Sequence, residues 1–173
     1  TIPPLVALID ECAFFDSELK QIEFSDDSNL QIIGKSAFRE TSIKNITIPS
    51  NVTKIYECAF ESCRKLRQIN FHPDIKLEAI NTKLFLFSSI ESICIPSSVI
   101  HIKEEAFSYC KKLKKITFQN DSKLQIIDKN SFSYSTIDNI EIPSELKIIK
   151  EDAFKYCNQL KHIISRIIRN FKY

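Results

Sequence analysis

The sequence predicts a repeat solenoid of the α/β type, mostly β, with a parallel sheet on one face and short helical turns on the other. Two observations predict it. One phenylalanine context recurs seven times at intervals of 22 to 25 residues, and each copy is followed by the same apolar phrase. Such self-similarity is the signature of a repeat architecture, so about seven coils should stack. The recurring residues are Phe14, Phe38, Phe60, Phe85, Phe107, Phe132 and Phe154.

The apolar phrase after each phenylalanine has the pattern of a strand. In one copy, Ile46 and Ile48 flank the polar Thr47. Alternation with a period of two is typical of a strand with one buried face. A second apolar pair follows, in this copy Val52 and Ile55. The short stretch that then carries the phenylalanine is predicted to be a single helical turn.

Coils of two lengths alternate, so the true unit is a pair of coils 47 residues long. In one coil the strand ends in Ile-Pro-Ser, and the next apolar residue is four along. In the other coil a polar loop intervenes, and the next apolar residue is six along. Proline has no amide hydrogen to donate, so it should lie at the strand end, where the ladder stops. These prolines are Pro49, Pro96 and Pro143.

One coil cannot bury its own apolar face, so stacked coils should share a continuous core. The phenylalanines should form a ladder inside it, together with Cys63, Cys110 and Cys157, which are 47 residues apart. Two coils of stacking place these cysteines about 10 Å apart, beyond the roughly 7 Å Cα separation that a disulfide tolerates. We therefore expect buried free thiols here, and likewise at Cys12 and Cys58.

Composition and motif spacing point away from most kinds of chemistry. With one glycine in 173 residues, phosphate loops and nucleophile elbows are improbable. The net charge of +2 gives no overall basic signal for nucleic acid, and no apolar run approaches the roughly 20 residues of a membrane span. The histidines lie in different coils, and no Cys-x-x-Cys pair suggests zinc. We expect no catalytic residue, metal or cofactor.

Acidic residues recur every 47 residues in the longer loops, at Asp27, Asp74 and Asp121. Aligned carboxylates can share a calcium ion, but aspartate is also a standard turn residue that bonds its own backbone. The turn interpretation is favoured, since lysines accompany two of the copies.

The exposed face of the predicted sheet is the candidate binding site. Strand alternation directs one polar set outward, a nearly neutral strip without aromatic residues, and solenoids commonly bind proteins on such extended faces. A plain solvated face fits the same pattern, and the sequence leaves both interpretations open. The residues are Gln21, Glu23, Asn45, Thr47, Gln68, Asn70, Ser92, Cys94, Lys115, Thr117, Asn139 and Glu141.

The C-terminal segment breaks the repeat, so we expect a solenoid over residues 1–164 and a cap or tail over 165–173. Ser165 stands where a phenylalanine or isoleucine belongs, and the apolar residues from Ile163 to Phe171 fall at helical spacing. A capping helix is favoured; a partner-binding or membrane-surface helix and a ragged end are the alternatives. The opening Thr1-Ile2-Pro3 lies inside a coil, which suggests a processed product or a fragment.

Two phrases resemble the BspA-type leucine-rich repeats. They are Ala-Phe-Glu-Ser-Cys-Arg-Lys-Leu at 59–66 and Ile-Pro-Ser-Ser-Val at 95–99, and the resemblance extends from Ile2 to about Ile163. It implies a gently curved, non-catalytic solenoid at a cell surface that adheres to host or matrix proteins. Free thiols suit the alternative function, an intracellular scaffold or assembly subunit. The sequons at Asn45, Asn51 and Asn120 leave secretion and glycosylation open.

One departure from this family concerns a glycine that often follows the second apolar pair. Here only Gly34 is present. If that position needs left-handed backbone, asparagine and aspartate can substitute, but tyrosine and lysine do so less readily. The other copies carry Asp10, Tyr56, Asn81, Lys103, Asp128 and Lys150.

Overall fold

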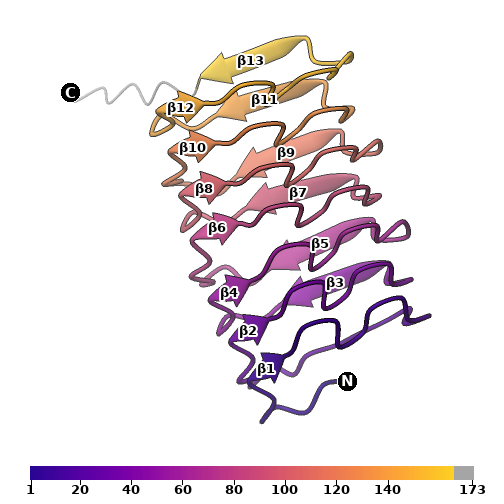
Figure 1. The fold of residues 1–173 in the computed structure, drawn as a ribbon. Coiled ribbons are helices and arrows are strands. Elements are labelled where there is room, and N and C mark those ends of the chain that lie inside the picture. The colour runs from indigo at the N-terminus through magenta and orange to yellow at the C-terminus, as the bar shows by residue number, and fades with distance from the viewer. Residues whose placement is uncertain (166–173) are drawn as a thin grey trace, which may run out of the picture.

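The computed structural model describes residues 1–165 and consists of stacked coils that climb from the N-terminus to β13 (Figure 1). Each complete coil contributes one longer and one two-residue strand. The longer strands are β3 (Asn45–Ile48), β5 (Gln68–Phe71), β7 (Ser92–Ile95), β9 (Lys115–Phe118), β11 (Asn139–Ile142) and β13 (His162–Ser165). The short strands are β1 (Leu8–Ile9), β2 (Ile32–Ile33), β4 (Lys54–Ile55), β6 (Ala79–Ile80), β8 (His101–Ile102), β10 (Ile126–Ile127) and β12 (Ile148–Ile149).

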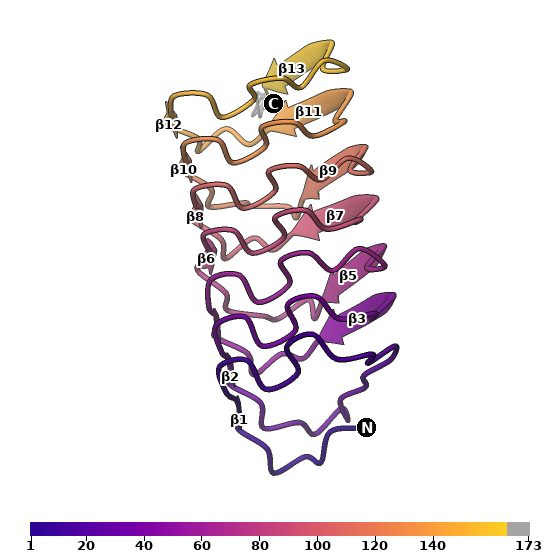
Figure 2. The same cartoon turned by 45° about the vertical axis from the view of Figure 1, so that its right-hand side comes forward.

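The longer strands form one parallel sheet in chain order. The short strands form two parallel sheets, β1-β2-β4 and β6-β8-β10-β12, which together line the opposite side of the coils as the short-strand stack (Figure 1). Register follows the repeat, so that Ile46 pairs with Ile69 and Ile93 with Ile116. An isolated bridge between Ile2 and Phe24 extends the pattern into the first coils. Figure 2 shows the coils from β3 onward as flattened loops with the longer strand along one side and the short strand along the other.

The predicted helical turn at each phenylalanine is wrong, because residues 1–165 contain no helix. Each phenylalanine instead lies between two residues of left-handed backbone, as Phe60 does between Cys58 (φ 59°) and Ser62 (φ 56°). The amides of these three residues donate to carbonyls in the next coil, at 3.1, 3.0 and 2.7 Å. Since those amides already have partners in the next coil, they cannot make the i→i−4 bonds of a helix.

Gly34 does not have left-handed backbone, although the glycine found there in similar repeats raised that possibility. Left-handed backbone occurs two residues later, at Ser36 (φ 53°), and again at Glu40 (φ 63°). Gly34 meets a different demand. A Cβ there would lie 2.6 Å from the carbonyl carbon of Asp10 and 2.6 Å from the amide nitrogen of Glu11. The glycine allows close approach between the first two coils.

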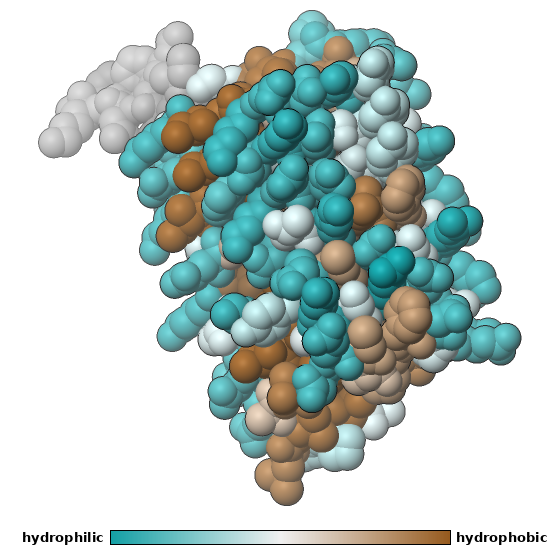
Figure 3. All heavy atoms as spheres, in the orientation of Figure 1, coloured by the Kyte–Doolittle hydropathy of each residue, from teal (hydrophilic) through white to brown (hydrophobic). Residues whose placement is uncertain are grey.

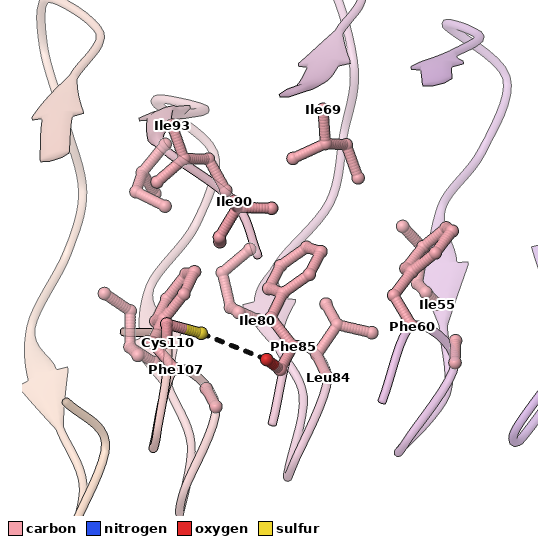
Figure 4. Packing of buried hydrophobic residues seen from close by; sticks show 14 of the residues in the cluster. Ile55, Phe60, Ile69, Ile80, Leu84, Phe85, Ile90, Ile93, Phe107 and Cys110 are labelled. Atoms are coloured by element: carbon pink, nitrogen blue, oxygen red, sulfur yellow. Dashed lines mark hydrogen bonds between the residues drawn. The ribbon is translucent and has the colours of Figure 1, made fainter. Parts of the chain in front are cut away.

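The phenylalanine ladder fills the space between the two strand stacks. Adjacent rings are stacked, with centroids 5.1 to 5.8 Å apart. The five central rings are fully buried, whereas Phe14 and Phe154 at the two ends are half-buried. Figure 4 shows Phe60, Phe85 and Phe107 in line among the isoleucines of both stacks. Parallel packing of like rings couples every coil to both of its neighbours.

The cysteines are all free, but they differ in burial. Cys63, Cys110 and Cys157 are buried; Cys58 is half-buried, and Cys12 and Cys94 are exposed, so the expected burial of Cys12 is wrong. The Sγ of Cys110 donates to the Phe85 carbonyl of the preceding coil at 3.0 Å (Figure 4), and Cys63 and Cys157 repeat this bond. Each buried thiol thus satisfies a carbonyl inside the ladder.

Thiol reactivity should follow this burial. Burial raises the pKa of Cys110 to about 12 and that of Cys63 to about 11, and the thiolate is the reactive form. In native protein, only Cys12 and Cys94 should react rapidly with a maleimide, as peptide mass spectrometry will show. Denatured, unreduced protein should titrate six free thiols; two or fewer would contradict the free-thiol ladder.

The last described strand also differs from the expected capping helix. Ile163 and Ile164 lie in β13, which pairs in parallel with β11 over its whole length. Pairing with β11 in the register of the repeat determines the conformation of these isoleucines, and their helical spacing does not. The remainder of the segment predicted as a cap or tail, residues 166–173, lies outside the described residues.

Candidate functional site

The exposed face of the longer-strand sheet is built by simple alternation. In β3, β7 and β11 the burial pattern is exposed, buried, exposed, buried, so every second side chain points away from the core. All twelve candidate residues lie on this outward set, and Thr117 alone is half-buried rather than exposed. Parallel register aligns them across strands, for example Asn45 with Gln68 and Cys94 with Thr117.

This surface contains three hollows in series along the solenoid. The largest, of about 740 Å³, lies over the first coils and β3, with Lys20, Lys44 and His72 around it. A second, of about 280 Å³, spans β5, β7 and β9 around Cys94. A third, of about 380 Å³, lies over β9 and β11 and reaches Ile164. The face is therefore uneven and extends over most of the solenoid.

Amides and hydroxyls dominate the chemistry of the face. Along single coils, Gln21 donates to Glu23 at 2.8 Å and Gln68 donates to Asn70 at 3.1 Å. Exposed amides can exchange such local bonds for bonds to a partner, because each carries both donors and an acceptor. The surface offers many neutral hydrogen-bonding groups and few charges, which suits a polypeptide partner better than a strongly charged one.

An aromatic stripe, exposed except at the half-buried Tyr109, runs along the phenylalanine turns and was not predicted from the sequence. Phe87, Tyr109, Tyr134 and Tyr156 stack in series with ring centroids 4.8, 4.4 and 4.6 Å apart. Each occupies the second left-handed residue of its turn. That backbone is unfavourable for bulky residues, and ring stacking offsets the strain. The available signal was an aromatic residue two positions after each of four core phenylalanines.

A three-residue ion network was also missed, because its members are far apart in sequence. Asp128 accepts from His101 Nε2 at 3.0 Å and from Lys150 Nζ at 2.9 Å, so it joins three successive coils. Its side chain is 17% exposed. Partial burial alone would raise the pKa of Asp128, but bonds from Lys150, the Lys129 amide and His101 hold that pKa below its ordinary value of 3.8. The ionised carboxylate is thus stabilised in the folded chain.

We expect Asp128→Asn to lower the free energy of unfolding by about 1 kcal/mol at neutral pH. A carboxyl whose pKa is depressed by folding contributes stability above its unfolded pKa and loses it as the pH falls through the folded value. The difference from wild type should therefore shrink as the pH falls below 3.8 and through the depressed pKa of Asp128. Urea titrations at several pH values will measure it, with the exposed Asp74→Asn as control. An undiminished difference in acid would contradict the role of the carboxylate.

Other sequence-predicted sites are not assembled into a centre. Within the described part of the chain, no three His, Cys, Asp or Glu side chains converge as metal ligands. Asp121 has left-handed backbone (φ 55°), as a turn residue does, and Asp27 and Asp74 are exposed. Over residues 1–165 there is also no helix with the length and apolar character of a membrane span.

Comparison with known proteins relates this geometry to a repeat family. A family model described as the BspA type leucine rich repeat region matches residues 1–85 and 78–171, in six copies. A leucine-rich repeat protein from Bacteroides ovatus is 28% identical, with a TM-score of 0.79 over 95% of this chain and 48% of its own. The pneumococcal vaccine antigen PcpA is 27% identical, with a TM-score of 0.75 over 83% of this chain and 38% of its own.

The remaining comparisons bear on the fold and on length. A leucine-rich cell surface protein from Faecalibacterium prausnitzii is 19% identical, with a TM-score of 0.52 over 91% of this chain and 70% of its own, and shows a shared fold alone. The chain spans about half or less of the length of the Bacteroides and pneumococcal proteins. Among curated proteins, none matches the chain.

Proposed function

Since the chain belongs to the BspA-type leucine-rich repeat family, we propose that it is a non-catalytic module that binds another protein through the exposed face of its longer-strand sheet. The observation that carries this proposal is the hollowed polar face over strands β3 to β11. Its regular residues form the core, so recognition falls to the irregular outward positions. Extended solenoid faces of this kind are suited to broad protein contacts.

The proposed setting is a cell surface, with a host or matrix protein as partner. Support comes from the pneumococcal vaccine antigen among the similar structures. A second candidate is an intracellular scaffold, which the six free thiols favour, because a reducing compartment preserves them. The same face would serve both roles with different partners.

The test is a pull-down in parallel from extracellular matrix and from cell lysate, read by mass spectrometry. A face variant, Asn70→Arg with Ser92→Arg, places two large cations on exposed positions of adjacent strands β5 and β7. The matched control, Asn29→Arg with Ser144→Arg, makes the same exchanges at exposed positions in the loops that follow Phe24 and β11, outside the strands. Both should retain wild-type stability within about 0.5 kcal/mol.

A saturable partner that binds wild type and control but is lost by the face variant would support the proposal. Its source, matrix or lysate, would decide between adhesion and scaffold. A partner that binds the face variant with unchanged affinity would contradict the assignment of the face. Absence of any saturable binder in both extracts would contradict the recognition function itself.

A further inference from the structure

Positive charge gathers in the turns that lead into β5 and β9. Residues 63–67 carry Arg64, Lys65 and Arg67, and residues 110–114 carry Lys111, Lys112 and Lys114; neither turn holds a carboxylate. We call these six residues the basic edge. Parallel strands all begin at one side of their sheet, so these turns lie along the same side of the solenoid, at the right in Figure 1.

The turn at 88–91 lies between the two basic turns and joins the basic edge into one surface, and the turn at 135–138 follows them. The Glu91 amide donates to the Arg67 carbonyl at 2.9 Å, and the Lys114 amide donates to the Glu91 carbonyl at 3.0 Å. Glu91 and Asp138 are the two carboxylates of these turns, at 88–91 and 135–138. Together the four turns carry six cations and two carboxylates, a net charge of +4. The whole chain carries +2, so the remaining residues sum to −2.

The cations of the basic edge are largely free of carboxylate partners, unlike those of the phenylalanine turns. In the phenylalanine turns, Lys35, Lys83 and Lys129 each contact a glutamate of the next coil, at 3.7, 3.7 and 3.4 Å. On the basic edge, within residues 1–165, only Arg67 has such a contact, with Glu91 at 3.9 Å. The edge therefore presents uncompensated positive charge to solvent.

Negative charge predominates at the other end of the longer strands, so the electrostatic field points from the basic edge across the sheet. The loops that follow Phe24, Phe71 and Phe118 carry Asp27, Asp74 and Asp121, and two of them also carry Lys76 or Lys123. Their net charges over residues 25–31, 72–78 and 119–125 are −2, −1 and 0. A surface with one sign of charge attracts a ligand of the other sign and accelerates its binding in a salt-dependent way. The edge that begins the strands is thus suited to an anionic ligand, and the edge that ends them is not.

The spacing of the charges indicates an extended polymer. The doublets Arg64-Lys65 and Lys111-Lys112 lie two coils apart, about 10 Å at the usual strand spacing. Four of the six cations are lysines, which contact anions as point charges without a planar geometry. Tyr109, the ring nearest to Lys111 in the sequence, offers no open face for a nucleobase, since Phe87 covers it on one side and Tyr134 on the other.

We propose that the basic edge binds a linear anionic polysaccharide through its sulfate or carboxylate groups. This site lies beside the hollowed face. Of the six residues of the basic edge, Lys114 alone also borders one of the three hollows. A polysaccharide and a protein partner could then occupy adjacent surfaces. The proposal does not depend on the protein-binding function, and variants of the two surfaces separate them.

The test measures binding of the full chain to dextran sulfate, with uncharged dextran of the same length as the ligand control. The edge variant is Lys65→Gln, Lys111→Gln and Lys112→Gln. The control variant is Lys76→Gln, Lys123→Gln and Lys147→Gln, three exposed lysines on the opposite loops. Each triple substitution changes the net charge from +2 to −1.

We expect wild type to bind dextran sulfate and not to bind dextran. Its affinity for dextran sulfate should fall as the salt concentration rises. The edge variant should bind more than about tenfold more weakly, a loss of about 1.4 kcal/mol, whereas the control variant should stay within about twofold of wild type. The Asn70→Arg, Ser92→Arg face variant should keep its dextran sulfate binding. Equal losses of dextran sulfate affinity in the edge and control variants would mean that net charge alone explains the binding, and would overturn the proposed site. Tighter edge-dependent binding of duplex DNA would overturn the ligand class.

Discussion

Replacing Phe85 with alanine is expected to lower the free energy of unfolding by about 3–5 kcal/mol. The ring is fully buried and stacks between Phe60, 5.8 Å away, and Phe107, 5.3 Å away. Its removal would leave a cavity at the centre of the ladder and weaken both coil interfaces at once. Urea denaturation followed by circular dichroism will measure the change.

The matched control for this substitution is Phe87→Ala, in the same turn. Phe87 is 45% exposed and ends the aromatic stripe, where it stacks on Tyr109 alone. Its replacement should lower the free energy of unfolding by less than about 1 kcal/mol. Equal effects at Phe85 and Phe87 would mean that the buried ladder does not dominate stability.

Gly34→Ala is expected to push the first coil away from the second. The packing of these two coils should be destabilised by about 1–3 kcal/mol. The added methyl would lie 2.6 Å from backbone atoms of Asp10 and Glu11, which cannot rotate away as a flexible side chain can. In a solenoid each coil contacts only its neighbours, so the damage should remain at the N-terminal end. The main unfolding transition of the central coils should change little.

Amide hydrogen exchange distinguishes this local effect from global destabilisation. The amides of Cys12, Phe14 and Asp16 donate to the second coil at 2.8 to 2.9 Å and should lose protection in Gly34→Ala. The Phe107 amide, which donates to Ser131 at 2.7 Å, should keep its protection. Lys103→Ala, at the equivalent position of a later coil, should leave both sets unchanged. Uniform loss of protection would contradict the local clash.

Strand alternation and the phenylalanine period could be predicted from the sequence because each is a local pattern. A period of two, as in Ile46-Thr47-Ile48, fixes which side chains face the core. The turns could not be predicted in the same way. Left-handed residues there include Lys83, Phe87 and Tyr156, whose types do not indicate positive φ. Bonds to the next coil impose that backbone, and such bonds are invisible in a single repeat.

The same distinction between local patterns and contacts between coils holds for the candidate site. The outward set could be predicted because it needs only strand alternation. The contact between His101 and Asp128 spans 27 residues and depends on exact register between coils, so it could not be read from spacing alone. The hollows likewise depend on how side chains of neighbouring strands leave space between them. The sequence therefore predicted which residues are exposed better than what they form together.

The most direct measurement of recognition by the sheet face uses the native thiol at its centre. Cys94 is exposed in β7 and lines the second hollow, whereas the exposed Cys12 lies in a phenylalanine turn. A maleimide photo-crosslinker is attached to Cys94 in a Cys12→Ser background, and to Cys12 in a Cys94→Ser background, and each protein is irradiated with the purified partner. A covalent adduct formed from Cys94 and not from Cys12 is the predicted result. Adducts formed equally well from Cys12, or from Cys12 alone, would place the partner elsewhere on the solenoid.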